Sequence, residues 1–266
     1  MSLLIICILI ICGILANIMS ALFGIGGGVL MVPVLHTLFP DLPFQMVSAT
    51  SLTIVIGTSL VNLSYFYKRK ISLSYKSMFL WSIGMLIGVQ IGFESSFYLS
   101  NTIIISVFIV TLLILAVRSF FFYKKTIDTD SYSVAKENYK GIILCGLGGG
   151  VAGMTGIGGG SVLAPLVGQL HSVKPNQIAV YTNYMMVIGG LGSLYSYLTR
   201  VPSAYLENSW QIGYVNFSIA GIVIASSFIT SFVSMRLKGI LTPELTHKCL
   251  GMILLAIALY MLVLQL

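Results

Sequence analysis

Long apolar stretches, separated by short polar loops, follow one another along the whole sequence. Several of them reach about 20 residues, which is the length of a helix that crosses a bilayer. The stretches are Leu3–Phe23, Ile25–Leu38, Gln45–Tyr67, Ser77–Phe93, Thr102–Tyr123, Lys140–Thr155, Ile157–Leu170, Gln177–Thr199, Gln211–Val233 and Leu245–Leu264. This pattern predicts an all-α integral membrane protein.

The same pentad, Gly-Ile-Gly-Gly-Gly, stands twice at the start of a short apolar stretch. The copies are Gly24–Gly28 and Gly156–Gly160, which are offset by 132 residues. The same offset pairs Pro33 with Pro165, Pro43 with Pro175, Gln45 with Gln177 and Thr50 with Thr182. A duplicated unit with a glycine-rich break inside apolar sequence is typical of transporters that are built from repeats.

The apolar stretch after each Gly run is too short to cross a membrane. About 13 helical residues extend roughly 20 Å, whereas the hydrocarbon core is about 30 Å thick. We therefore expect each run to join the two arms of a re-entrant hairpin, or to break a helix near the middle of the membrane. With the remaining stretches, each repeat becomes a hairpin plus three transmembrane helices.

The positions of the basic residues indicate how the two repeats are oriented. If each repeat is a hairpin plus three spans, all 14 Lys and Arg residues except Arg200 fall on one side of the membrane. If each repeat crosses four times, the split falls to 10 against 4. Basic loops are cytoplasmic, which favours the first arrangement, and its odd number of crossings makes the two repeats inverted. Two full spans in place of each hairpin would give the same sidedness.

The sequence therefore divides into three parts. The first transmembrane repeat covers residues 1–123, and the second covers residues 140–266. Residues 124–139, the only extended polar stretch, form the linker, which this topology places in the cytoplasm.

The composition agrees with a membrane protein and excludes several classes of function. The chain is 57% hydrophobic and 8% charged, whereas a soluble domain carries about 25% charged residues. The net charge of +7 comes from basic residues scattered in short loops, so we expect no nucleic-acid partner. Because the sequence has no nucleophile–base spacing, Cys/His metal motif or phosphate-binding loop, we expect no enzyme activity, metal or cofactor.

The Gly runs are the candidate substrate site. Unwound backbone inside a membrane must line a cavity or be buried in protein, and the helix after each run points free N–H groups and a positive dipole end at the midplane. Two such ends, with nearby hydroxyl and amide groups, suit a small anion. The predicted substrate-binding residues are Gly24, Gly26, Gly27, Gly28, Thr50, Ser51, Thr155, Gly156, Gly158, Gly159, Gly160, Ser161, Thr182 and Asn183. The alternative is that both runs are small-xxx-small packing motifs in continuous helices.

The acidic residues argue against a cation pathway. All seven lie in loops or at the ends of apolar stretches, at Asp41, Glu94, Asp128, Asp130, Glu137, Glu207 and Glu244. With no carboxylate in the middle of a span, a proton relay or a metal-cation site has little support.

The paired G-I-G-G-G-x-x-x-x-P blocks, each followed by P-x-Q-x-x-x-x-T, resemble the TauE/SafE family of sulfite and organosulfonate exporters. The resemblance covers nearly the whole chain. It implies a multi-pass permease of the bacterial inner membrane that exports sulfite, sulfoacetate or a related sulfur-containing anion by alternating access. By the same resemblance, the Gly runs and the helices that begin with Pro-x-Gln would line the anion path.

Two other functions remain open from the sequence. One is a permease for another small solute on the same scaffold, and the other is a non-transporting membrane assembly protein in which the Gly runs only pack helices. The expected partners are a small anionic substrate and the lipid bilayer. A homodimer is compatible with a small inverted-repeat transporter, although no segment specifies one.

Overall fold

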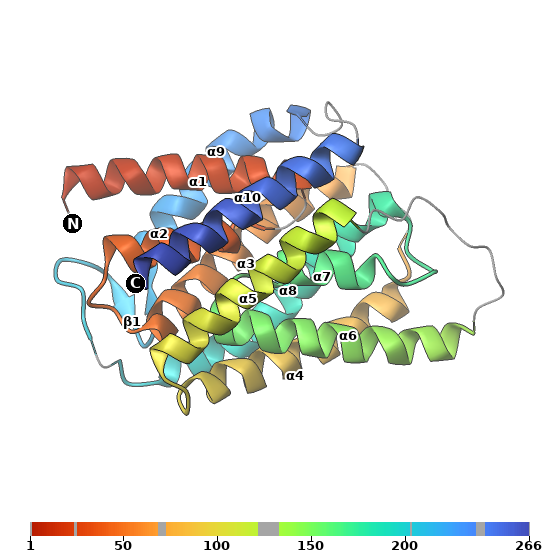
Figure 1. The fold of residues 1–266 in the computed structure, drawn as a ribbon, viewed down its shortest axis with the longest axis horizontal. Helices are drawn as coiled ribbons and strands as arrows, with labels where there is room; N and C mark the ends of the chain where they lie inside the picture. Colours follow the sequence, from red (N-terminus) through yellow and green to blue (C-terminus); the bar gives the residue numbers. More distant parts are fainter. Residues whose placement is uncertain are drawn as a thin grey trace.

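The computed structural model of the chain describes residues 2–23, 26–68, 73–121, 133–202, 204–237 and 243–265. The fold is a bundle of helices that run roughly along the long axis of the molecule (Figure 1). The helices are α1 (Leu3–Phe23), α2 (Gly28–Leu38), α3 (Phe44–Lys68), α4 (Tyr75–Ser96), α5 (Asn101–Phe121), α6 (Val134–Thr155), α7 (Gly159–Val167), α8 (Pro175–Thr199), α9 (Phe217–Leu237) and α10 (Pro243–Leu264).

The prediction of an all-α membrane protein is confirmed. Within the described residues, four helices are long and apolar enough to cross a bilayer: α1, α3, α4 and α5. The helices α2, α9 and α10 contain shorter apolar segments. Many large apolar side chains, such as Ile114 and Ile229, are exposed on the outside of the bundle, where lipid would cover them.

The apolar stretch Gln211–Val233 was expected to be helical, but its first six residues are not. These residues form a small hairpin of β1 (Gln211–Ile212) and β2 (Val215–Asn216). Gly213 has a φ of +56°, which lets the chain turn tightly between the two strands. The side chain of Asn216 then accepts the Ile219 N–H at 3.1 Å, which caps α9 and explains why that helix begins only at Phe217.

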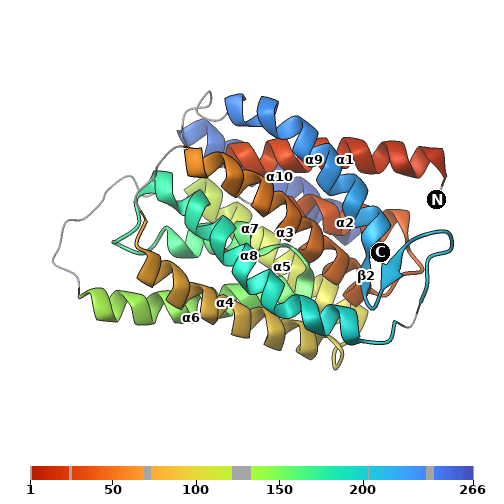
Figure 2. The same cartoon turned by 180° about the vertical axis from the view of Figure 1, so that it is seen from behind.

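Both Gly runs separate a long helix from a short one that turns back beside it. The pairs are α1 with α2 and α6 with α7, and we call them hairpin 1 and hairpin 2. The open ends of the two hairpins lie at opposite ends of the molecule (Figures 1 and 2). Both chain termini lie at the open end of hairpin 1. We call this the termini end, and we call the end where α5 finishes and α6 begins the opposite end. Continuous helices through the runs are therefore excluded.

The helix contacts repeat themselves when elements are exchanged between the two halves of the chain. The long arm of hairpin 2, α6, packs on α4, and the long arm of hairpin 1, α1, packs on α9. In the same way α3 contacts α9 while α8 contacts α4, and the pairs α3–α8 and α5–α10 join equivalent helices. The long arm of each hairpin thus packs against the half of the chain to which it does not belong, while the short arms α2 and α7 contact α3 and α8 of their own halves.

The contact between α4 and α6 is made largely by glycines. A Cβ added at Gly84, Gly88 or Gly92 of α4 would overlap backbone carbonyl groups of α6. From the other side, a Cβ at Gly149 or Gly153 would overlap backbone atoms of α4. The two helices therefore approach to backbone contact, as small-xxx-small sequences allow in membranes.

Candidate functional site

The tips of the two hairpins meet inside the bundle. A Cβ at Gly28, the first residue of α2, would overlap the carbonyl group of Ile157 in the second Gly run. Val55 of α3 lies against both runs, because its side chain contacts the Cβ positions of Gly26, Gly28 and Gly158. Ile157 and Val55 are both buried, so the meeting point is enclosed by protein.

The turns at the tips require glycine. Gly26 and Gly156 both have a φ of +72°, and Gly158 has a φ of +82°, conformations that L-residues with a side chain rarely adopt. Gly156 ends α6 as a left-handed cap whose N–H donates to the Ala152 carbonyl at 2.8 Å. Because Gly26 and its counterpart under the 132-residue offset, Gly158, both have a positive φ, the sequence duplication is also a duplication of backbone geometry at this position.

The N-terminus of α7 points its N–H groups at a methionine. The Gly160 N–H donates to Sδ of Met186 in α8 at 2.9 Å. The same side chain reaches the other run, because a Cβ at Gly26 would lie 3.5 Å from Met186 Cε. A thioether is a weak hydrogen-bond acceptor. An oxyanion could therefore displace the Met186 sulfur from the Gly160 N–H and form a much stronger hydrogen bond there.

Hydroxyl groups of α3 hold the broken backbone of hairpin 2. Ser51 Oγ donates to the Gly156 carbonyl at 2.8 Å, and Ser48 Oγ donates to the Met154 carbonyl at 3.5 Å. Within the run itself, Ser161 Oγ donates to the Gly158 carbonyl at 3.1 Å. These bonds give partners to carbonyl groups that the helix break leaves without intrahelical ones.

Other predicted site residues act locally or lie away from the tips. Gly27 is the N-cap of α2, and Gly159 begins α7. The hydroxyl of Thr155 donates to the Val151 carbonyl of its own helix, at 2.6 Å. Thr50 accepts the Asn216 N–H at 3.1 Å and so holds the β-hairpin. Gly24 lies outside the described residues.

In α8, Thr182 and Asn183 both donate to the Ala179 carbonyl, at 3.1 and 2.6 Å. Asn183 Oδ1 also accepts a hydrogen bond from Nδ2 of Asn62 at 3.3 Å, which links α8 to α3. The structure therefore gathers the described glycines of the two runs, Ser51 and Ser161 at the tips. Thr182 and Asn183 instead bond to the preceding turn of their own helix.

Sequence reasoning missed the side chains that cover the tips. Met186, Val55 and Met85, whose Cε lies against the Cβ position of Gly159, are apolar residues inside apolar stretches. Nothing in their local sequence separates them from ordinary packing residues. The offset of 132 residues pairs Met186 with Ile54, so the two repeats differ at this position.

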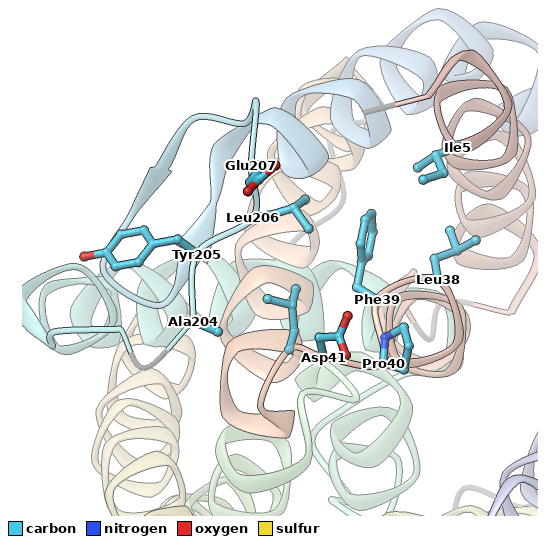
Figure 3. Close-up of a pocket in the computed structure, with 10 residues that line it drawn as sticks. Ile5, Leu38, Phe39, Pro40, Asp41, Ala204, Tyr205, Leu206 and Glu207 are labelled. Atoms are coloured by element: carbon cyan, nitrogen blue, oxygen red, sulfur yellow. The ribbon is translucent and has the colours of Figure 1, made fainter.

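Two cavities lie at the two ends of the molecule. A cavity of about 370 Å³ at the termini end is lined by Ile5, Phe39, Asp41, Leu206 and others from Leu38–Leu42 and Ala204–Glu207. In Figure 3, Phe39 stands between Ile5 and Leu206. A cavity of about 350 Å³ at the opposite end is lined by residues that include Ser74, Glu137 and Ser172.

The two cavities are counterparts under the offset of 132 residues. The offset pairs Ile5 with Glu137, Pro40 with Ser172 and Ser74 with Leu206. Each cavity lies between the base of one hairpin and a loop of the other half of the chain. Because neither cavity includes a residue of a Gly run, neither one reaches the hairpin tips in this conformation.

Charge differs between the two ends. Lys76, Lys136 and Lys174 are exposed at the opposite end, whereas Arg200 at the termini end pairs with Glu94 and stacks 3.9 Å above the ring of Phe97. No group of three or more His, Cys, Asp or Glu residues that could hold a metal is found among the described residues.

Comparison with known proteins gives matches over nearly the whole chain. The model of the sulfite exporter TauE/SafE family matches residues 9–261. A probable membrane transporter protein of Haemophilus influenzae is 56% identical over 97% of this chain and 96% of its own length. One from Methanocaldococcus jannaschii is 28% identical over 96% and 94%, and one from Bacillus subtilis is 29% identical over 75% and 80%. No solved structure matches.

Proposed function

This chain is a membrane transporter that belongs to the sulfite exporter TauE/SafE family, and from that premise we propose that it exports a small sulfur-containing anion, such as sulfite, sulfoacetate or a related organosulfonate. Transport would cross the bacterial inner membrane by alternating access. The inside-negative potential favours the exit of an anion by about 2.3 kcal/mol per charge for each 100 mV.

The observation that carries this proposal is the environment of the α7 N-terminus. The Gly160 N–H has Met186 Sδ as its acceptor in the centre of the bundle, where the two Gly runs meet. An anion held there would gain charge-assisted hydrogen bonds from backbone N–H groups without any buried cationic side chain. We take this point as the substrate site, with the Gly runs Gly24–Gly28 and Gly156–Gly160 on its two sides.

Inverted repeats are the second part of the proposal. Three observations support them: the helix contacts that repeat between the halves, the opposite directions of the two hairpins, and the counterpart cavities at the two ends. With the basic residues in the cytoplasm, the opposite end would be cytoplasmic and both termini would face the periplasm. The linker, residues 124–139, would then be cytoplasmic; of its residues, 133–139 are described, and Val134–Tyr139 form the first turns of α6.

In this proposal the structure corresponds to an occluded conformation. The hairpin tips are buried, and each end cavity stops short of them. Movement of one hairpin relative to α3 and α8 would connect the site first to one cavity and then to the other.

Flux measurements on purified protein in liposomes test the substrate. We expect efflux of sulfite or of a sulfonate in the wild type, and a loss of at least tenfold in Gly159→Leu, because Met85, Leu163 and Met186 leave no room for a side chain there. Gly221→Ala is the matched control, since nothing lies within 4 Å of a Cβ at that position. A protein that moves none of sulfite, sulfoacetate, taurine and thiosulfate would instead transport another solute on the same scaffold.

A further inference from the structure

The cavity at the opposite end contains a buried carboxylate. Glu137, in the first turn of α6, is 7% exposed. Its Oε1 accepts the Ser172 N–H, in the loop after α7, at 3.1 Å. Its Oε2 is also buried and has no hydrogen-bond partner in the structure. Burying a carboxylate oxygen without a hydrogen-bond partner costs free energy, so Oε2 is an atom to which a ligand could bind favourably.

The surroundings of Glu137 are rich in oxygen. The Tyr181 hydroxyl, from α8, lines the same cavity and accepts the Ser74 N–H at 2.8 Å. Ser74 Oγ and Ser77 Oγ, from the loop before α4 and from α4 itself, lie 3.0 Å apart. One carboxylate and several hydroxyl groups form a donor set that suits a hard cation rather than an anion.

Within the described residues, no charged side chain near the cavity is found to pair with Glu137. Lys136 and Lys140 on its own helix are exposed, as are His171 and Lys174 in the loop between α7 and α8. From α4 the nearby charged residue is Lys76, which is also exposed, and α8 contributes the phenol of Tyr181. No ion pair of Glu137 is found within the described part of the chain.

The counterpart position in the other repeat is Ile5, so the fold does not require a carboxylate there. The cavity at the termini end does contain Asp41 and Glu207, but both are exposed. A buried acidic group is thus confined to one of two otherwise equivalent cavities, which is typical of a functional residue in a repeat transporter.

We propose that the Glu137 cavity binds the coupling cation of the transport cycle, a sodium ion held by Oε2 and the neighbouring hydroxyl groups. This inference rests on the proposed function as a permease. The sodium ion would neutralise one buried carboxylate.

The position of Glu137 explains how cation binding in this cavity would affect the substrate site. Its bond to Ser172 ties the start of α6 to the loop after α7, which closes the base of hairpin 2. The tip of the same hairpin carries Gly156–Gly160, one α6 helix away. A cation that changes the bond to Ser172 would therefore change the hold on the hairpin that carries half of the site.

Thermal unfolding of the full chain in detergent tests the cavity without any knowledge of the substrate. Wild type, Glu137→Gln and the control Glu207→Gln are melted in sodium chloride and in choline chloride at one fixed pH. We expect sodium to shift the wild-type and Glu207→Gln melting temperatures by roughly 4 °C or more, and Glu137→Gln to lose that shift.

The inference is overturned if the wild type shows no sodium-dependent shift, or if Glu137→Gln responds to sodium as the wild type does. If Glu137→Gln does not fold, Glu137→Asp keeps the charge and should need several-fold more sodium for the same shift, and an unchanged midpoint would overturn the inference equally. Flux separates the two proposals. Anion efflux that ignores a sodium gradient refutes the coupling site alone, whereas a Glu137-dependent shift without efflux of any sulfur anion refutes the substrate alone.

Discussion

Ser51 illustrates how one hydroxyl group can belong to both halves of the molecule. It lies on α3, in the first half of the chain, yet it donates to the Gly156 carbonyl in the second Gly run. Because Ser51 is fully buried, water cannot replace the bond. The shape of the second hairpin tip therefore depends on a residue more than a hundred positions earlier in the chain.

We predict that Ser51→Ala lowers the stability of the protein by about 1–3 kcal/mol, because it leaves a buried carbonyl group without a partner. A thermal melt in detergent measures this effect as a shift of roughly 2–4 °C for each kcal/mol. Ser64→Ala is the control, since that serine is exposed on the same helix and bonds within its own turn. Equal melting temperatures for the two variants would contradict the assigned role of Ser51.

Met186 carries a second prediction at this scale. The change Met186→Leu keeps the volume but removes the sulfur that the Gly160 N–H now uses. We expect anions to bind roughly fivefold more tightly, because they no longer compete with an internal acceptor worth about 1 kcal/mol. Anion-dependent melting measures the affinity, with Met46→Leu as a buried control on α3. Unchanged affinity would mean that the substrate does not reach Gly160.

Among the elements, the α4–α6 pair approaches to backbone contact along its glycines. Gly88 faces the carbonyl group of Gly146, so even a methyl group at position 88 would force the helices apart. We predict that Gly88→Ala destabilises the protein by about 1–3 kcal/mol through overpacking. Gly221→Ala, on α9, has open space and should melt like the wild type. If both variants melt alike, the glycines of α4 are not packing residues.

The elements also separate what the sequence can and cannot predict. The breaks at the Gly runs were predictable because glycine runs and short apolar stretches are local signals, and the offset repeated them. The β-hairpin before α9 was missed because only Gly213 and Asn216 mark it within an apolar stretch. The sequence places Glu137 in the linker and does not predict its burial. That burial depends on Ser172 and on α8, which are far from Glu137 in the sequence.

At the scale of the whole molecule, the two cavities face opposite ends of the bundle. Our topology predicts that a cysteine at Ser74 reacts with a membrane-impermeant thiol reagent only from the cytoplasmic side. A cysteine at Ala204, in the other cavity, should react only from the periplasmic side. The background variant must lack Cys7, which is exposed. Reaction of both positions from the same side would refute the inverted repeats.

The packing of α1 on α9, which belongs to the other half of the chain, also has a consequence for synthesis. Asn17 of α1 donates to the Ser227 carbonyl of α9, 210 residues further along. At about 5–20 residues per second, α1 waits roughly 10–40 s for that partner after it leaves the ribosome. It is the most apolar of the four span-length helices, and only 28% of the residues in its most apolar segment are buried even in the finished fold, so lipid can surround it during the delay. The helix α1 therefore reaches its packing partner only after most of the chain between them has been made.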